Sequence, residues 1–168
     1  MYVCGKGFFN FAEEIMKNDS STIRITKLFH FEMAHALYGY DGPCKNIHGH
    51  SYELAVTIIG KVENDKKNPK QGMVLDFSVL KEIVNKLIME ELDHALVLNE
   101  NSPHKKMLND NSMFEKIVLT KFQPTCENLL VDFATTIQKH LPKNIKLHHL
   151  KLRETPSSYA EWFADDNK

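Results

Sequence analysis

The sequence predicts an α+β domain in which an antiparallel sheet carries two antiparallel helices on one face. Segments beginning at Ile23 and at His48 alternate apolar and polar residues with the period of two that is typical of half-buried strands. The segments 79–92 and 124–141 repeat apolar residues at helical spacing. Strand pairs flank these helices, with hairpin-type connections. A small sheet of this kind has unpaired edges, and we expect oligomerisation to cover them.

Composition and charge limit the possible functions. The chain has 168 residues, 42% of them hydrophobic, and a formal net charge of −1. This length favours one domain, which we expect at residues 22–168, behind an N-terminal appendage at residues 1–21. Near-neutral charge argues against nucleic acid as the main partner, because phosphate binding needs clustered Lys and Arg. No apolar run approaches the roughly 20 residues of a membrane helix, so we expect no membrane association.

The cysteines and the start of the chain indicate a reducing compartment. Cys4, Cys44 and Cys126 are an odd number at irregular spacing, which does not favour a disulfide framework. The first residues lack the basic segment followed by an apolar one that is typical of a secretory signal. We therefore expect a cytoplasmic protein.

The first two strands place three histidines on the face that the helices cover. The apolar positions of the first strand share one parity, broken only by Lys27: Ile23, Ile25, Phe29, Phe31 and Met33. His35 continues this parity, whereas His30 belongs to the other face. The second strand runs over residues 51–62, and extending it back places His48 and His50 on its apolar face, roughly 6 to 7 Å apart.

The remaining elements follow in chain order. They are a short strand at 73–77, a helix at 79–92 capped by Asp76 or Ser78, a polar loop at 99–112, a short edge strand at 117–122, a helix opened by Pro124-Thr125 and stopped by Pro142, a strand at 146–154, and an extended piece containing Tyr159, Trp162 and Phe163.

Three inward-facing histidines favour a metal site. A single histidine on an apolar face is usually a core residue that hydrogen-bonds within the protein. Burying His35, His48 and His50 together would leave several ring nitrogens needing partners, at roughly 1 to 3 kcal/mol for each unpaired group. One metal ion satisfies them at once, and zinc is the metal that such a set favours. Gly49 between two of them permits close backbone approach.

Cys44 permits three interpretations. A buried cysteine is normally a small apolar residue. Cys44, however, lies between Pro43 and Lys45 in a polar loop, four residues before His48. A nearby zinc ion and Lys45 would favour its thiolate, which acts as a base or nucleophile. Cys44 could equally be a fourth zinc ligand, which would make the site structural and closed.

Three acidic positions are also candidates. Asp93-His94 ends the first helix, where a cationic histidine is favourable, but an adjacent Asp can also hold an imidazole ready for proton transfer. Glu154 continues an apolar strand face inward, and a buried carboxylate needs a partner such as a ligand with paired N–H donors. Glu127, just after Thr125, is a first-turn acid that the helix dipole favours.

Taken together, these motifs resemble the 6-pyruvoyl-tetrahydropterin synthase and 6-carboxy-tetrahydropterin synthase family, which has the tunnelling (T) fold. The resemblance runs from about Ile23 to Trp162. It rests on five motifs in this order: Phe31-Glu32-Met33-Ala34-His35, the segment from Cys44 to His50, Leu92-Asp93-His94, Pro124-Thr125-Cys126-Glu127-Asn128, and Arg153-Glu154-Thr155.

The resemblance implies a role for each motif. The histidines that match His35, His48 and His50 hold Zn²⁺ in the family, and the cysteine that matches Cys44 is the base. The resemblance also implies a homo-oligomer in which the sheets form a barrel. The implied assembly is a hexamer made of two trimers.

The remaining motifs are implied to handle protons and the substrate. The pair that matches Asp93 and His94 assists proton transfer, and the glutamate that matches Glu154 anchors the pterin ring. Glu127 and Thr125 match positions near the same pocket.

The spacing of Cys44 and His48 separates the two activities in the family. Synthases of the pyruvoyl product tend to carry a longer insertion there, so the short spacing resembles 6-carboxy-tetrahydropterin synthases of queuosine biosynthesis. The implied substrate is 7,8-dihydroneopterin triphosphate. The alternatives are 6-pyruvoyl-tetrahydropterin synthesis and a non-catalytic, zinc-stabilised pterin-binding module. The sequence departs from the family in its N-terminal extension and in a longer link within residues 99–123.

Overall fold

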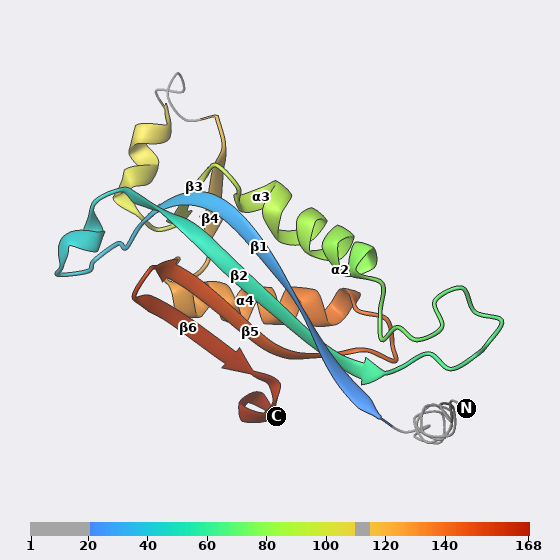
Figure 1. Cartoon of the computed structure of the whole chain (residues 1–168). Coiled ribbons are helices and arrows are strands. Elements are labelled where there is room, and N and C mark those ends of the chain that lie inside the picture. The colour runs from blue at the N-terminus through green and yellow to red at the C-terminus, as the bar shows by residue number, and fades with distance from the viewer. Residues whose placement is uncertain (1–20, 110–114) are drawn as a thin grey trace, which may run out of the picture.

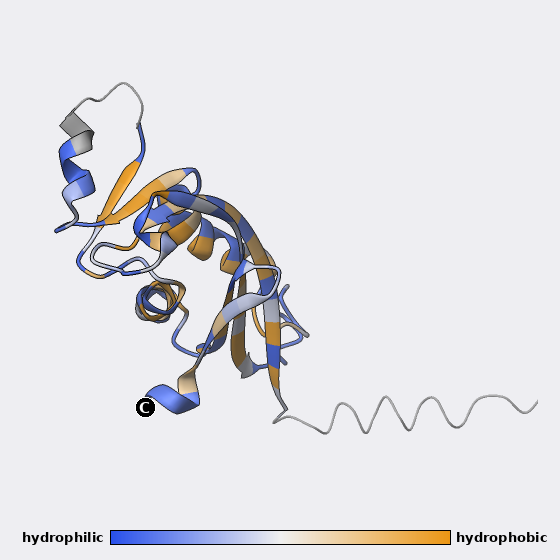
Figure 2. Cartoon of the chain, turned by 90° about the vertical axis from the view of Figure 1, so that its left-hand side faces the viewer, coloured by the Kyte–Doolittle hydropathy of each residue, from blue (hydrophilic) through white to orange (hydrophobic). Residues whose placement is uncertain are grey.

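The computed structural model describes residues 21–109 and 115–168, without the side chains of residues 107–109. A six-stranded sheet with the order β4-β3-β1-β2-β5-β6 forms one layer. Helical segments lie on one side of this curved sheet (Figures 1 and 2). The strands are β1 (Thr22–Ala36), β2 (His48–Lys61), β3 (Ala95–Asn99), β4 (Ile117–Thr120), β5 (Lys146–Thr155) and β6 (Ser158–Phe163). Apart from residue 21, the expected N-terminal appendage lies outside the described residues.

The α+β class and the layer of two helices are confirmed, but the sheet is mixed. Strands β1, β2, β5 and β6 pair antiparallel. Strand β3 pairs parallel to β1, and β4 pairs parallel to β3. The first helix follows β2 and leads to β3, which lies on the far side of β1 and runs in the direction of β1. The five residues of β3 are all buried, which leaves no alternation by which a half-buried strand is recognised.

Strands β1 and β2 follow the predicted alternation. They pair continuously from Thr22↔Lys61 to His35↔His48. The even-numbered apolar residues of β2 are almost fully buried under the helices, each at most 1% exposed: Tyr52, Leu54, Val56 and Ile58. Both strands therefore carry the core on the face where the three histidines were expected.

Residues 73–76 form no strand and the first helix already begins at Phe77, so the strand predicted at 73–77 is wrong. The Met73 carbonyl accepts from the Glu63 N–H in a loop. Asp76 then caps the helix by accepting from the Ser78 N–H at 2.8 Å. Short polar side chains that bond nearby backbone favour helix starts over strands. The helix consists of α2 (Phe77–Val84), a π-helical turn η2 (Asn85–Met89) and α3 (Glu90–Leu92).

The second helix, α4 (Cys126–His140), covers the same face. Its N-cap is Thr125, as the Pro124-Thr125 pair predicted. It buries one apolar stripe against the sheet: Leu129, Leu130, Phe133, Ala134 and Ile137. Three shorter 3-10 segments complete the described chain: η1 (Pro43–Lys45), η3 (Pro103–Asn109) and η4 (Ala164–Asn167). Within the described residues, no helix is long and apolar enough to cross a membrane.

The opposite face of the sheet is open and largely polar. Thr26 and Thr57 share a hydrogen bond of 2.8 Å across β1 and β2. Arg153 pairs with Glu53 at 3.1 Å. These contacts satisfy polar groups without a covering layer, so the two faces of one sheet have different chemistry.

Candidate active site

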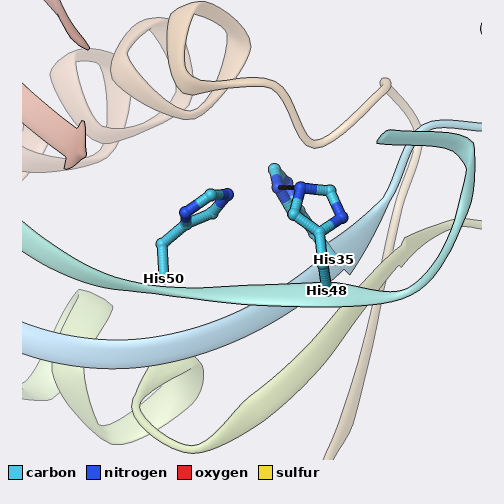
Figure 3. Close-up of side chains that lie close together, drawn as sticks. All are labelled: His35, His48 and His50. Atoms are coloured by element: carbon cyan, nitrogen blue, oxygen red, sulfur yellow. Dashed lines mark hydrogen bonds between the residues drawn. The ribbon is translucent and has the colours of Figure 1, made fainter. Parts of the chain in front are cut away.

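Three imidazoles converge on the covered face at the end of the β1–β2 ladder (Figure 3). Register places His35 opposite His48, and His50 opposite Met33. One ring nitrogen from each of the three histidines lies within 4.8 Å of the others. The predicted convergence is therefore observed, and it follows from side-chain parity on two paired strands.

Backbone carbonyls fix the orientation of two of these rings. His35 Nδ1 lies 2.7 Å from the Pro124 carbonyl oxygen, and His48 Nδ1 lies 2.9 Å from that of Asn46. A carbonyl oxygen only accepts, so each Nδ1 carries the proton and each Nε2 presents a lone pair. Ligating histidines are commonly held in this way through their other nitrogen.

The two Nε2 lone pairs face each other at 3.2 Å, the contact drawn dashed in Figure 3. They repel unless a proton or a cation lies beside them. Burial lowers the pKa of His35, which disfavours the extra proton. Two nitrogens bound to one tetrahedral zinc lie about 3.4 Å apart, given zinc–nitrogen bonds of about 2.0–2.1 Å. The histidines present therefore fit a metal ion.

Glu154 reaches the same cluster from β5. Its Oε1 lies 3.5 Å from His35 Nε2 and 3.7 Å from His50 Nε2. Tyr52 donates its hydroxyl to this Oε1 at 2.9 Å. Burial and the neighbouring carboxylate raise the pKa of Tyr52 above its ordinary value, so the phenol remains a donor. The inward direction expected for Glu154 is observed, and Tyr52 is the partner that its carboxylate needed.

The loop that carries Cys44 is fixed beside the cluster. Leu37 N–H donates to the Cys44 carbonyl at 2.9 Å. Gln123 holds the loop from the segment before α4, accepting from Tyr38 N–H at 3.2 Å and donating its amide to the Tyr38 carbonyl. The Cys44 thiol is free and half-buried, and its sulfur is not among the ligand atoms within 4.8 Å of one another. This arrangement gives no support to Cys44 as a fourth ligand.

Thr125 and Glu127 lie at the start of α4. Thr125 Oγ1 accepts from Asn128 N–H at 3.3 Å, which is an N-cap contact. Glu127 is exposed in the first turn. The neighbouring Pro124 carbonyl holds His35, so this helix start is joined to the histidine cluster through the backbone.

His94 lies on the opposite face of the sheet from the histidine cluster, and Asp93 precedes it at the end of the first helix. His94 Nδ1 lies 3.0 Å from Asp93 Oδ1. Asp93 Oδ1 also accepts from the Glu32 N–H at 2.9 Å, which holds the pKa of Asp93 below its ordinary value. His94 N–H donates to the Glu32 carbonyl at 2.6 Å. Side chains of β1 alternate, so Glu32 points away from the face that bears His35.

His94 opens into a cleft of about 810 Å³, lined also by Glu32, Gly49, His50, Ser51 and Lys116. Its backbone has a φ of +61°, in the left-handed region that side chains rarely adopt. Its side chain is 76% exposed. By strand parity, the His94 side chain and the rings of the histidine cluster thus point to opposite sides of the sheet.

Gly49 lines this cleft, and its surroundings differ from the close backbone approach that the sequence suggested. A Cβ added at Gly49 would lie 3.4 Å from the Met33 carbonyl oxygen and 3.8 Å from Ala34 Cβ. These are ordinary contacts, so β-sheet packing within one chain does not require glycine there.

Residues 24–165 match the model of the 6-pyruvoyl tetrahydropterin synthase family. The chain belongs to this family. Over 141 residues it is 36% identical to the 6-carboxy-5,6,7,8-tetrahydropterin synthase of Haemophilus influenzae, covering 83% of this chain and 97% of that protein. It is 31% identical to the enzyme of the same name from Rickettsia felis, covering 83% of this chain and 99% of that protein. Both relatives match over nearly their whole length.

Solved structures share the fold. An uncharacterized protein from Wolinella succinogenes superposes with a TM-score of 0.71 at 20% identity, covering 86% of this chain and 99% of that one. The 6-pyruvoyl tetrahydropterin synthase of Caenorhabditis elegans gives 0.60 at 22% identity, covering 86% and 96%. The T-fold is confirmed, and the chain is an enzyme of the tetrahydropterin synthase type, a lyase.

Proposed function

We propose that this chain is a zinc-dependent 6-carboxy-5,6,7,8-tetrahydropterin synthase of queuosine biosynthesis. It converts 7,8-dihydroneopterin triphosphate and one water molecule to 6-carboxy-tetrahydropterin, acetaldehyde and triphosphate. The observation that carries the proposal is the convergence of one ring nitrogen from each of His35, His48 and His50. Relatives that bear this name, and the short spacing from Cys44 to His48, support the carboxy product. We place the protein in the cytoplasm, consistent with free thiols at Cys44 and Cys126.

His35, His48 and His50 would hold the zinc ion. When bound, zinc supplies Lewis acidity that polarises oxygens of the substrate side chain and acidifies the neighbouring C–H bonds. Cys44 acts as the base that removes a proton from carbon. Its loop is held by the Gln123 contacts, which limit the positions that the thiol can take.

The remaining roles concern proton exchange and positioning. His94, oriented by Asp93, exchanges protons with the other side of the substrate. Glu154 accepts N–H donors of the pterin ring through the oxygen that Tyr52 leaves free, which aligns the side chain of the substrate. Thr125 and Glu127 contribute to the pocket wall at the start of α4.

A complete site requires a second copy of the chain. The rings of the histidine cluster and the His94 side chain point to opposite sides of the same sheet, so one substrate cannot touch both within one chain. Residues 22–168 are the proposed synthase domain, with residues 1–21 as an appendage. Copies of this domain assemble into a barrel through the edges of their sheets, as a hexamer formed from two trimers.

Product analysis tests this function. Zinc-loaded protein incubated with 7,8-dihydroneopterin triphosphate should release acetaldehyde together with triphosphate. Triphosphate with a pyruvoyl pterin and no acetaldehyde would establish 6-pyruvoyl-tetrahydropterin synthesis, the alternative that the family description favours. Absence of triphosphate release would overturn the enzymatic proposal.

The Cys44→Ala variant tests the base. We expect it to retain zinc and lose about 10²- to 10⁴-fold in turnover, the usual contribution of a positioned acid or base. Cys4→Ala, at a cysteine in none of the motifs, is the control. Loss of zinc together with activity in Cys44→Ala would instead make Cys44 a ligand.

A further inference from the structure

Tyr52 is buried and held rigidly beside the histidine cluster. Its ring is 1% exposed and stacks on Phe31, with centroids 5.1 Å apart and planes inclined by 10°. It meets His50 edge-on at 5.6 Å and His35 at 6.3 Å. Its hydroxyl is consequently a donor at a fixed point, with little conformational freedom left to lose.

The Tyr52 hydroxyl forms a hydrogen bond with the Glu154 carboxylate. It donates to Oε1 at 2.9 Å, and that same oxygen lies 3.5 Å and 3.7 Å from the Nε2 atoms of His35 and His50. A cation held by these nitrogens would attract the Glu154 carboxylate strongly. Carboxylates bind zinc at about 2.0–2.2 Å, so a small displacement would make Glu154 a fourth protein ligand.

A fourth protein ligand would change the type of site. Catalytic zinc sites keep three protein ligands and one open position, whereas four protein ligands close the site. The hydrogen bond from Tyr52 occupies a lone pair of Oε1 and opposes rotation of the carboxylate toward the three nitrogens. A neutral donor to a carboxylate makes one of the stronger hydrogen bonds in proteins.

We propose that Tyr52 is a positioning residue that holds the Glu154 carboxylate away from the metal. It thereby keeps one coordination position open and leaves Oε2 available to a ligand. The proposal rests on the proposed function, since it takes the three histidines to hold a metal ion. It gives Tyr52 a role that the sequence motifs do not assign.

The Tyr52→Phe variant isolates the hydroxyl. Phenylalanine keeps the ring stacked on Phe31, so the fold should be retained, which circular dichroism and thermal unfolding check. Cobalt(II) replaces zinc as a spectroscopic probe, and azide, a small anion, reports an open coordination position through changes in the visible spectrum. Tyr159→Phe is the matched control, because Tyr159 is 54% exposed on the open face.

The expected results differ from those of a purely structural residue. In Tyr52→Phe, azide should bind cobalt at least about tenfold more weakly than in the parent protein, because Glu154 fills the open position. Zinc itself should bind more tightly. Loss of a residue with only a supporting role would weaken zinc binding by about 10- to 100-fold instead.

A second substitution separates the alternatives. Adding Glu154→Gln to Tyr52→Phe should restore azide binding, because the amide is a poor zinc ligand. Equal azide binding in Tyr52→Phe and the parent, or weaker zinc binding in Tyr52→Phe, would overturn the role of Tyr52 and leave the proposed function intact. A parent protein that takes up neither cobalt nor zinc would overturn the metal site, and both proposals with it.

Discussion

The two faces of the sheet hold their functional histidines in opposite ways. On the covered face, His35 is 2% exposed and its ring is oriented by a backbone carbonyl. On the open face, the His94 side chain is 76% exposed and its Nδ1 lies 3.0 Å from the Asp93 carboxylate, while its backbone N–H donates to the Glu32 carbonyl. Burial and fixed tautomers suit metal binding, whereas exposure suits proton exchange. This contrast underlies the proposal that a complete site forms between copies of the chain.

The largest effect is expected on the covered face. His50→Ala removes one of three converging nitrogens, so stoichiometric zinc should be lost and activity should fall by at least about 100-fold. Metal analysis and a triphosphate-release assay measure both. His140→Ala, at the exposed end of α4, should change neither. Retention of full zinc content in His50→Ala would refute the three-histidine site.

Mixing two inactive variants tests whether the two faces cooperate across copies. His50→Ala lacks the metal half-site and His94→Ala lacks the proton half-site. Random co-assembly should restore about a quarter of the parent activity, because each composite site draws one half from each of two chains. Each variant assembled alone provides the control. No recovery in hetero-oligomers verified by mass spectrometry would contradict the composite site.

The pH dependence of the free energy of unfolding tests whether the histidines of the covered face are buried. Desolvation lowers the pKa of His35 and His50 below 6.5 in the folded, metal-free chain. The unfolded chain binds protons at 6.5, so stability should be level above that pH and decline as the pH falls through it. Urea unfolding with a chelator between pH 7.5 and 5.5 measures this. His50→Gln should show a shallower decline, and a parent curve that stays flat would refute the burial argument.

The smallest effect concerns the backbone of the open face. His94→Gly should raise the free energy of unfolding by about 0.5–1 kcal/mol, because glycine adopts a positive φ without the Cβ cost. Activity should fall at the same time. His94→Asn, which tolerates this region better than most residues, should change stability less. A destabilised His94→Gly would mean that the contact with Asp93 outweighs the backbone strain.

The local features of the site could be predicted from the sequence. Alternation along β1 and β2 was enough to bring three histidines to one face, because parity on paired strands determines direction. Capping chemistry located the start of α4 at Thr125. The same rule named Asp76 or Ser78 as the cap of the first helix. The cap is Asp76, which is incompatible with the strand predicted at 73–77.

The remaining features depend on contacts between distant residues. The Gln123 contacts with Tyr38 join positions 85 residues apart, and Gln123 belongs to no recognisable motif. Likewise, Asp93-His94 reads as a helix end in sequence. Its placement on the open face follows from the parallel pairing of β3 with β1, and a wholly buried strand carries no periodicity that would reveal that pairing.

The π-helical turn Asn85–Met89 makes the position of Asp93 depend on the number of residues in the first helix. Such a turn holds one residue more than an α-helical turn. Deleting a single residue there would give a regular helix that still buries its apolar stripe up to that point. The helix after the turn would keep nearly the same orientation, because the shorter turn still completes one full rotation. A deletion in α2 that left the π-helical turn in place would instead rotate everything after it by about 100°, carrying Asp93 away from the Glu32 N–H. Such a deletion would leave every motif intact and still remove the contact between Asp93 and Glu32.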